Sequence, residues 1–421
     1  MKLLQINPVL RTTTSTGRII REIGDAAMAS GWESYIAYSA GRDGKMEETN
    51  PFGSASSMEC TSRTVPVGDR MSVAFHGLAT RMFDRHGLAS VEATRKFIKD
   101  IERIDPDVIH IHNIHGYFLN YEILFDWLSR CGKQVIWTVH DCWLFTGHCY
   151  HYMNAGCDKW KYGCGQCPQT REFPKSWLID RSAKNWRDKK NAFCSVPSDK
   201  MTIVTVSDWL KGEMQQSFLK DFRYKVIHNG IDTEVFKPSD GTAVRRRYGI
   251  GDRKMYMGAA SIWSAAKGLD DFISLASMLT PQEVIVLVGL DKNQMTRMPA
   301  NIIGIPRTSD VHELAELYSA ADAFLNLTYQ DNYPTVNLES ISCGTPVVTY
   351  RTGGSPESVT GQCGMVTDCG DVAQALAAAR KIAATDRSVW RDNCRAYGLA
   401  NFRKADRYAD YIKLYKELLN G

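Results

Sequence analysis

Short apolar runs alternate with longer stretches of helical periodicity along most of this chain. In the first half, apolar runs short enough to be β-strands stand at 2–6, 34–38, 108–111, 134–138 and 202–206. Between them, apolar residues recur every three or four positions, which predicts helices at 16–30, 91–103 and 121–130. Such alternation is typical of a parallel α/β sheet.

The second half repeats the pattern. After a strand at 225–227 that ends the first half, strands are predicted at 254–259, 284–288, 323–327 and 347–349, and helices at 269–279, 311–319 and 371–384. Asp310 and Glu313 have capping-box spacing at the start of the second of these helices. Two such sheets in one chain imply two Rossmann-like domains, with a cleft between the carboxyl ends of their strands.

We place the first domain at residues 1–227 and the second at 228–399. The hinge is expected near 228–232, where Asn229-Gly230 forms a sharp turn directly after a strand. A last amphipathic helix, 404–419, follows the second domain.

The composition and length predict a globular protein with two hydrophobic cores. A chain of 421 residues exceeds the size of one ordinary domain. A net charge of +4 is too small to indicate nucleic-acid binding, although it allows attraction to an acidic membrane face. No window has the roughly 18 uninterrupted apolar residues of a membrane span, and the N-terminus breaks too early for a signal peptide. We therefore expect the cytoplasm.

Two carboxylates, Asp331 and Glu339, stand eight positions apart across the predicted start of a helix. Pro334 is placed to occupy the first helical position, and Cys343 precedes the glycine that ends the helix. N–H groups at such a helix start can cradle a pyrophosphate. The residues of this cradle are Asn332, Tyr333, Pro334, Thr335 and Val336. The arrangement suits a nucleotide sugar, whereas the plain alternative is an Asp N-cap with a solvated Glu on a surface helix.

Other candidate contacts lie in loops that follow predicted strands. Lys267 could bind a phosphate group, and Ser261 lies at the start of the same loop. A lone lysine before glycine is more often a solvated turn residue. His140 follows the strand 134–138 and would face the cleft. Gly17, in the Thr- and Ser-rich loop 7–17, allows close approach of the backbone, and Arg11 lies in the same loop.

The segment 331–348 resembles the acidic signature of the family-4 retaining glycosyltransferases, and 226–238 resembles their interdomain segment. The resemblance covers essentially the whole chain. It implies the GT-B fold: two Rossmann-like domains with parallel sheets facing across a cleft, and a C-terminal helix that brings 400–421 back to the first domain. It also implies transfer of a sugar from a nucleoside-diphosphate sugar to an acceptor hydroxyl with retention, and no metal requirement at the donor.

The resemblance also implies a role for each site residue. Glu339 would hold the ribose hydroxyls and Asp331 those of the hexose. His140 would steady the sugar near its anomeric carbon, and Lys267 would neutralise the leaving diphosphate.

The chain departs from the family at two of these places. Relatives usually carry an arginine five or six residues before the lysine, where this chain has Ser261 and Ile262. Phosphate binding would then depend more on helix N-termini. Relatives often carry paired glycines in the first loop, where this chain has only Thr16-Gly17.

Twelve cysteines in a chain without an export signal are not expected to form disulfides. Four of them combine a C-x2-C knuckle with two further thiols at loop spacing: Cys149, Cys157, Cys164 and Cys167. Four thiolates can hold a structural zinc ion, which would order a loop with little helix or strand pattern. Reduced thiols packed in a loop are the alternative.

The run 140–168 resembles one branch of family 4, which contains exopolysaccharide enzymes of the colanic-acid type. That branch suggests a glycan or lipid-linked acceptor, in exopolysaccharide, capsule or lipopolysaccharide synthesis. The basic and aromatic segment 175–190 could lie on the inner face of the plasma membrane, or form an ordinary surface helix with Trp186 in the core. A non-catalytic zinc-stapled GT-B scaffold, a sugar-nucleotide epimerase and a phosphorylase are the alternative functions.

Overall fold

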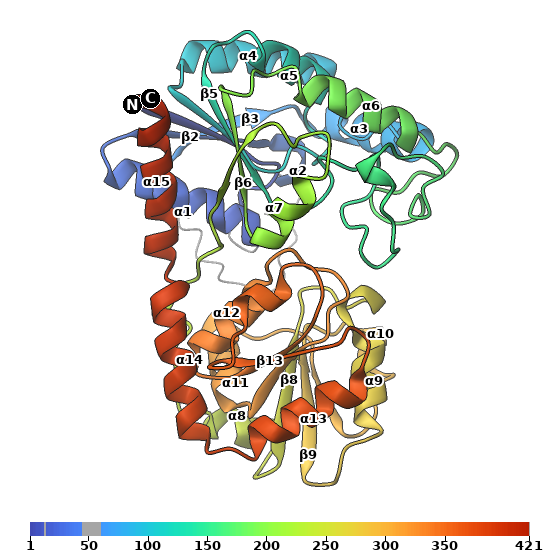
Figure 1. Cartoon of the computed structure of the whole chain (residues 1–421), viewed down its shortest axis with the longest axis vertical. Coiled ribbons are helices and arrows are strands. Elements are labelled where there is room, and N and C mark those ends of the chain that lie inside the picture. Colours follow the sequence, from blue (N-terminus) through green and yellow to red (C-terminus); the bar gives the residue numbers. More distant parts are fainter. Residues whose placement is uncertain (12–13, 44–59, 421) are drawn as a thin grey trace. The chain divides into compact units, whose positions relative to one another are not determined.

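A computed structural model describes residues 1–11, 14–43 and 60–420 of the chain. The chain divides into two compact units, one formed by Met1–Ile227 with Tyr408–Gly421 and the other by His228–Arg407. Each unit is one parallel sheet with helices on both faces (Figure 1). The predicted α/β architecture with two parallel sheets is confirmed.

The first unit has a sheet of seven strands in the order β3-β2-β1-β4-β5-β6-β7. These strands are β1 (Lys2–Ile6), β2 (Glu33–Ser39), β3 (Arg63–Val67), β4 (Val108–Ile111), β5 (Gln134–Val139), β6 (Met201–Thr205) and β7 (Arg223–Val226). The helices are α1 (Ser15–Ala29), α2 (Ala40–Asp43), α3 (Arg70–Phe83), α4 (Val91–Ile104), α5 (Tyr121–Leu128), α6 (Ser182–Phe193) and α7 (Asp208–Met214), with a short η1 (Lys159–Lys161). Every residue of β4 and β6 is buried, as expected for central parallel strands covered on both faces.

The last helix, α15 (Lys404–Asn420), packs beside α1 on one face of this first sheet (Figure 1). Ile19 and Ile23 of α1 join Tyr411 and Tyr415 of α15 in one buried cluster over the strands. The expected returning segment 400–421 is therefore divided. Residues 408–421 belong to the first unit, and 400–407 belong to the second.

The second unit has a sheet of six strands in the order β10-β9-β8-β11-β12-β13. These are β8 (Lys254–Ala259), β9 (Glu283–Val288), β10 (Ile302–Ile305), β11 (Ala323–Asn326), β12 (Val347–Tyr350) and β13 (Gly364–Thr367). The helices are α8 (Thr242–Arg247), α9 (Leu269–Ala276), α10 (Lys292–Met295), α11 (Val311–Ala320), α12 (Thr335–Ser342), α13 (Val372–Ala383) and α14 (Arg387–Asn401), with η2 (Ala265–Lys267) and η3 (Ser355–Ser358). Helices α9 and α13 cover one face of the sheet, and α11, α12 and α14 cover the other (Figure 1).

One predicted helix start was wrong, and another, at Val311, is where it was expected but without the full capping box. Pro334 is the N-cap residue of α12, so the helix begins one position later, at Thr335. Asp310 caps α11 by accepting hydrogen bonds from the N–H groups of His312 and Glu313. The capping box is incomplete, because the Glu313 carboxylate accepts from the backbone and hydroxyl of Ser309 instead of reaching back to Asp310.

Across the described residues, no helix is both long enough and apolar enough to cross a membrane.

Candidate functional site

Lys267 and Asp331 meet at the carboxyl end of the second sheet. Strands β8 and β11 are parallel neighbours, so the loops that follow them leave the sheet side by side. The Lys267 ammonium lies 2.7 Å from the Asp331 carboxylate. Both side chains are partly exposed, at 37% and 22%, which leaves them open to a ligand.

Backbone contacts fix this pair in place. The Tyr329 N–H donates to the carbonyl of Ala266 at 2.9 Å, and so joins the η2 turn to the loop before α12. Gly268 has φ +75°, and a Cβ there would lie 2.1 Å from the Leu327 carbonyl oxygen. A glycine after Lys267 is therefore required by close approach of the two loops. Ser261, earlier in the same connection, is exposed.

The predicted phosphate cradle is the loop and first turn that open α12. Asn332 and Tyr333 are buried, and the Tyr333 ring stacks on His228 with centroids 4.7 Å apart and planes 10° apart. Thr335 and Val336 form the first helical turn and are partly exposed. Pro334 provides no side-chain cap to the helix.

Glu339 lies inside α12 and is 6% exposed. The Tyr318 hydroxyl, from α11, donates a hydrogen bond to its Oε2 at 3.1 Å. Burial raises the pKa of Tyr318 well above its ordinary value, with the Glu339 charge adding to the effect, so the phenol remains a donor. Glu339 is therefore a held carboxylate, which differs from the solvated surface Glu of the plain alternative.

Sequence reasoning missed the loop after β12. Gly353 has φ +52°, and a Cβ there would lie 2.0 Å from the Asp331 carbonyl oxygen. The Gly354 N–H donates to that same carbonyl at 3.1 Å. A Gly-Gly pair directly after a strand was the available signal, and its role is to hold the backbone that carries Asp331.

In the first unit, His140 follows β5 and belongs to a chain of hydrogen bonds. Its Nε2 lies 3.0 Å from Nδ1 of His112, whose Nε2 lies 3.3 Å from Oε1 of Gln5. The Gln5 amide is oriented by its own donation to the Ile20 carbonyl at 2.8 Å. Gln5 therefore accepts from His112, and His112 in turn accepts from Nε2–H of His140. This tautomer makes Nδ1 of His140 an acceptor. Burial lowers the pKa of His140 to about 4, so the ring is neutral at neutral pH.

Two other histidines of the first unit, His110 and His115, are held by contacts within that unit. His110 is wholly buried, with Nδ1 2.7 Å from the Tyr415 hydroxyl and Nε2 2.7 Å from Oγ1 of Thr138. His115 lies 2.7 Å from Asp141, directly after His140. Burial raises the pKa of Asp141, but the charge and hydrogen bond of His115 outweigh it and bring the value to about 2.

Gly17 lies in the first turn of α1, where its N–H donates to the side chain of the N-cap residue Thr14 at 3.1 Å. A Cβ on Gly17 would lie 2.1 Å from the Arg11 carbonyl oxygen, so the loop closes tightly on this glycine. Thr12 and Thr13 of the same loop lie outside the described residues.

The four cysteines predicted as metal ligands come together in the first unit. They line one cavity of about 20 Å³ with His148 and Trp160. All four are free thiols, and Cys149 is the most buried of them.

Two protein-family models match the chain. The model described as Glycosyltransferase Family 4 matches residues 16–235, just over half of the chain, and the one described as Glycosyl transferases group 1 matches residues 253–386. WcaC of Escherichia coli K12, named as a colanic acid biosynthesis glycosyl transferase, is 23% identical over 364 residues, which cover 85% of each chain.

Solved glycosyltransferase structures share the fold at low sequence identity. Sucrose-phosphate synthase of Thermosynechococcus elongatus superposes with a TM-score of 0.71 at 15% identity, over 100% of this chain and 99% of that one. HepE of Anabaena, solved in complex with UDP, gives 0.66 at 16% identity over 99% and 100%. The two parallel α/β sheets and these neighbours identify the fold as GT-B.

Proposed function

This chain belongs to glycosyltransferase family 4, and on that basis we propose that it transfers a sugar, with retention, from a nucleoside-diphosphate sugar to an acceptor hydroxyl. The observation that carries the proposal is the Lys267–Asp331 pair, 2.7 Å apart, in the loops beside the start of α12. A cation and two carboxylates around a helix N-terminus suit a diphosphate flanked by hydroxyl groups. HepE, which shares the fold, binds UDP in its crystal structure.

Lys267 and the opening turn of α12 neutralise the leaving diphosphate in this proposal. The bond between the anomeric carbon and the phosphate oxygen breaks, and a bond to the acceptor oxygen forms on the same face. The acceptor proton passes to the departing phosphate oxygen. Fixed positive charge where negative charge develops lowers the barrier, so the donor site needs no metal.

Because Lys267 is paired with Asp331, donor binding exchanges one anionic partner of the lysine for another. A diphosphate competes with the Asp331 carboxylate for the Lys267 ammonium, and the released carboxylate then accepts from hydroxyls of the hexose. Glu339, held by Tyr318 at 3.1 Å, accepts from the ribose hydroxyls. We propose that His140 contacts the donor sugar near the anomeric carbon, with Nδ1 of His140 as the hydrogen-bond acceptor.

The acceptor is proposed to be a glycan carried on a lipid, reached at an anionic membrane surface. The exposed apolar residues Met71, Phe75 and Leu78 lie on one face of α3, at 81%, 66% and 53% exposure. The loop that carries Trp177 joins this helix, since the Trp177 N–H donates to the Arg81 carbonyl at 2.7 Å.

We call this apolar face with Trp177, Leu178 and Ile179 the α3 surface. Trp177 and the two residues after it are 45–66% exposed. Arg70, Arg81 and Lys175 are exposed around it. A helix with an apolar face and basic neighbours is typical of an interfacial contact with acidic lipid.

The first experiment is a thermal-shift screen of the purified protein against nucleoside diphosphates, with and without EDTA. A ligand of the folded state raises the melting temperature by mass action. One nucleotide should raise it selectively, and the shift should survive EDTA. Lys267→Ala should strongly reduce the shift, whereas Lys292→Ala, on α10, should keep it. The absence of any shift would contradict the donor-site assignment.

The membrane contact is tested separately by flotation with vesicles of phosphatidylglycerol and phosphatidylcholine. Trp177→Ser should reduce the bound fraction, and the matched control Val389→Ser, at a residue 51% exposed on α14, should not. Equal binding by both variants, or none by the unchanged protein at low salt, would refute the α3 surface as a docking site.

A further inference from the structure

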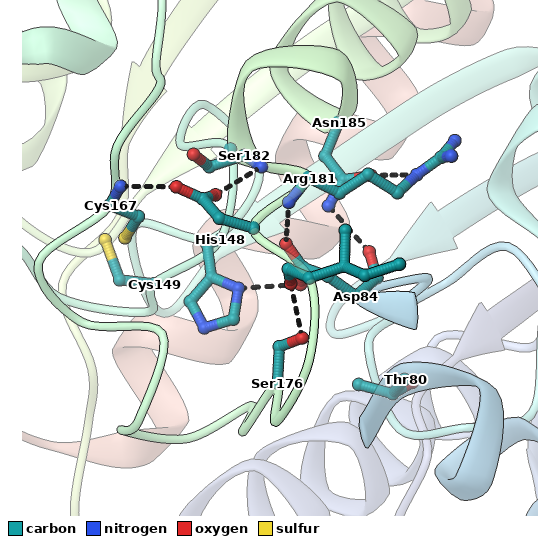
Figure 2. Close-up of polar contacts among 12 residues, drawn as sticks. Thr80, Asp84, His148, Cys149, Cys167, Ser176, Arg181, Ser182 and Asn185 are labelled. Atoms are coloured by element: carbon teal, nitrogen blue, oxygen red, sulfur yellow. Dashed lines mark hydrogen bonds and ion pairs between the residues drawn. The ribbon is translucent and has the colours of Figure 1, made fainter. Parts of the chain in front are cut away.

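The loop between β5 and α6 carries four cysteines around one small cavity. Cys149, Cys157, Cys164 and Cys167 all line it, together with the imidazole of His148. Its volume of about 20 Å³ has room for a single atom the size of a water molecule. Figure 2 shows Cys149 and Cys167 beside His148 and Asp84.

The backbone of this loop has the features of a thiolate knuckle. The Gly147 N–H donates to Sγ of Cys164 at 3.2 Å. Hydrogen bonds from N–H groups stabilise thiolates, which are the form that binds a metal.

The same knuckle contains one strained residue and one close backbone approach. Gln166, between the two cysteines of the C-x2-C motif, has φ +48°, a left-handed conformation that a non-glycine residue rarely adopts. A Cβ on Gly147 would lie 2.1 Å from the Ser182 carbonyl oxygen and 2.8 Å from the Cys164 Cβ. The Lys159 ammonium holds the knuckle by donating to the Gly165 and Gln166 carbonyls at 3.1 Å each.

A buried cation faces the thiols. Lys189 is 1% exposed, and its ammonium donates to the carbonyls of Trp143 and Thr146 at 2.6 and 2.9 Å. Within the described residues it makes no ion pair with a carboxylate. The same ammonium lies 3.5 Å from the centroid of the Trp143 ring. A buried charge is costly without a counterion, so an anionic centre beside the thiols would stabilise this lysine.

His148 supplies a second observation that points to a ligand. Both His148 and Asp84 have fully buried side chains, with Nδ1 2.7 Å from Oδ1. Nε2 of His148 is buried and has no hydrogen-bond partner. Asp84 also accepts from the Arg181 N–H at 2.9 Å, so this clamp ties the loop to the end of α3 and the start of α6 (Figure 2). Nδ1 carries the proton that is donated to the Asp84 carboxylate, so an Nε2–H exists only in the imidazolium form, for which a metal-bound thiolate beside the cavity would be the acceptor.

We propose that Cys149, Cys157, Cys164 and Cys167 bind one structural zinc ion as thiolates, with Lys189 as counterion and His148 beside the bound thiolates. Zinc is the divalent ion that a closed set of four thiolates selects in ordinary tetrahedral sites. A zinc ion with four thiolates is a dianion, which accounts for the buried cation. Among the described residues no three of these sulfurs yet lie within 4.8 Å of one another, so binding must draw them inward.

Metal analysis of the full-length, untagged protein tests the proposal. We expect one zinc per chain, four sulfur neighbours in zinc-edge X-ray absorption, and a lower melting temperature after chelation. Cys164→Ser should lose the zinc, and Cys194→Ser, an exposed thiol at the end of α6, should keep it. Substoichiometric zinc with melting unaffected by chelation would overturn the proposal, and so would iron or a nitrogen neighbour at the metal.

The role of Lys189 has its own control in the adjacent residue. Lys189→Met should transfer zinc to a competing chelator about tenfold faster than the unchanged protein, because the dianion loses its counterion. Lys190→Met, which removes an exposed ammonium one position away, should leave the rate unchanged. Equal rates in the two variants would remove Lys189 from the centre. Because nucleotide-induced stabilisation is read in the other unit, failure of the zinc test and failure of the donor proposal are distinguishable.

Discussion

Removing the hydroxyl of Tyr318 isolates the contact that holds Glu339. The Tyr318 ring is fully buried in α11, with Phe236 and Phe324 rings at centroid distances of 6.2 and 5.2 Å. Tyr318→Phe preserves this packing and deletes only the donor 3.1 Å from the carboxylate. The substitution therefore tests one hydrogen bond without creating a large cavity.

The expected magnitude follows from the charge of the acceptor. A hydrogen bond to a charged group contributes about 1.5–3 kcal/mol. In a unit of this size a loss of about 2 kcal/mol lowers the melting temperature by about 4–8 °C. If Glu339 holds the ribose, its loosened carboxylate also binds the donor more weakly. We expect KM for the donor to rise about tenfold, which corresponds to about 1.4 kcal/mol, with little change in kcat.

The matched control is Tyr248→Phe in the same unit. Tyr248 donates to a different carboxylate, Glu313, at 2.7 Å, so it loses the same kind of bond. Both variants should lose stability, and only Tyr318→Phe should raise KM for the donor. Equal KM in the two variants, or a fall in kcat alone for Tyr318→Phe, would refute the ribose role of Glu339.

Three further outcomes follow from the same structure. Asp331→Asn should bind a free nucleoside diphosphate about 2–5-fold more tightly by calorimetry, because Lys267 loses its competing anion. Sugar transfer should fall by roughly 100-fold. Weaker nucleotide binding would exclude exchange at the lysine. Gly353→Ala, forced to φ +52° with its Cβ 2.0 Å from a carbonyl oxygen, should cost about 1–3 kcal/mol, whereas the open position Gly361→Ala should melt like the unchanged protein. Burial lowers the pKa of His76 to about 3; protonation then favours the unfolded chain, so the contribution of His76 to stability, complete above pH 6.5, should fall by about 2 kcal/mol at pH 5. The fall in stability should be shallower by that amount in His76→Gln.

Elements with regular burial were predictable from sequence, and those with exposed apolar faces were not. The strands at 108–111 and 254–259 were predicted with the bounds that the structure has. Strand β3 was missed because it lies at the sheet edge with mostly exposed residues, so its apolar run is short. Helix α3 was missed because Met71 and Phe75 point to solvent. A periodic pattern that assumes apolar residues face the core cannot identify a helix whose apolar face is outside.

The residues of the candidate site could be selected from sequence, but their partners could not. Local patterns mark Glu339 inside a helix and His110 on a strand. Their contacts with Tyr318 and Tyr415 depend on how helices return to the sheets, and the second pair lies 305 positions apart along the chain. A contact between residues so far apart along the chain leaves no local pattern in the sequence. The tautomer and charge of a site histidine can therefore be derived only from the fold.

In the proposed donor site, the ion pair would account for phosphate binding without the arginine that is usual in the family. Ser261, at that position, is exposed and carries no charge. A single cation beside two carboxylates leaves a net negative charge, which opposes a diphosphate unless the cation changes partner. Lys267 and Asp331 are both partly exposed and 2.7 Å apart, so the exchange requires rotation of side chains only. The cost of separating an exposed pair is about 1 kcal/mol or less, whereas a diphosphate gains both the lysine and the opening turn of α12. Donor binding should therefore weaken with salt more steeply in the unchanged protein than in Lys267→Ala, and equal salt dependence would show that the helix start binds the diphosphate without the lysine.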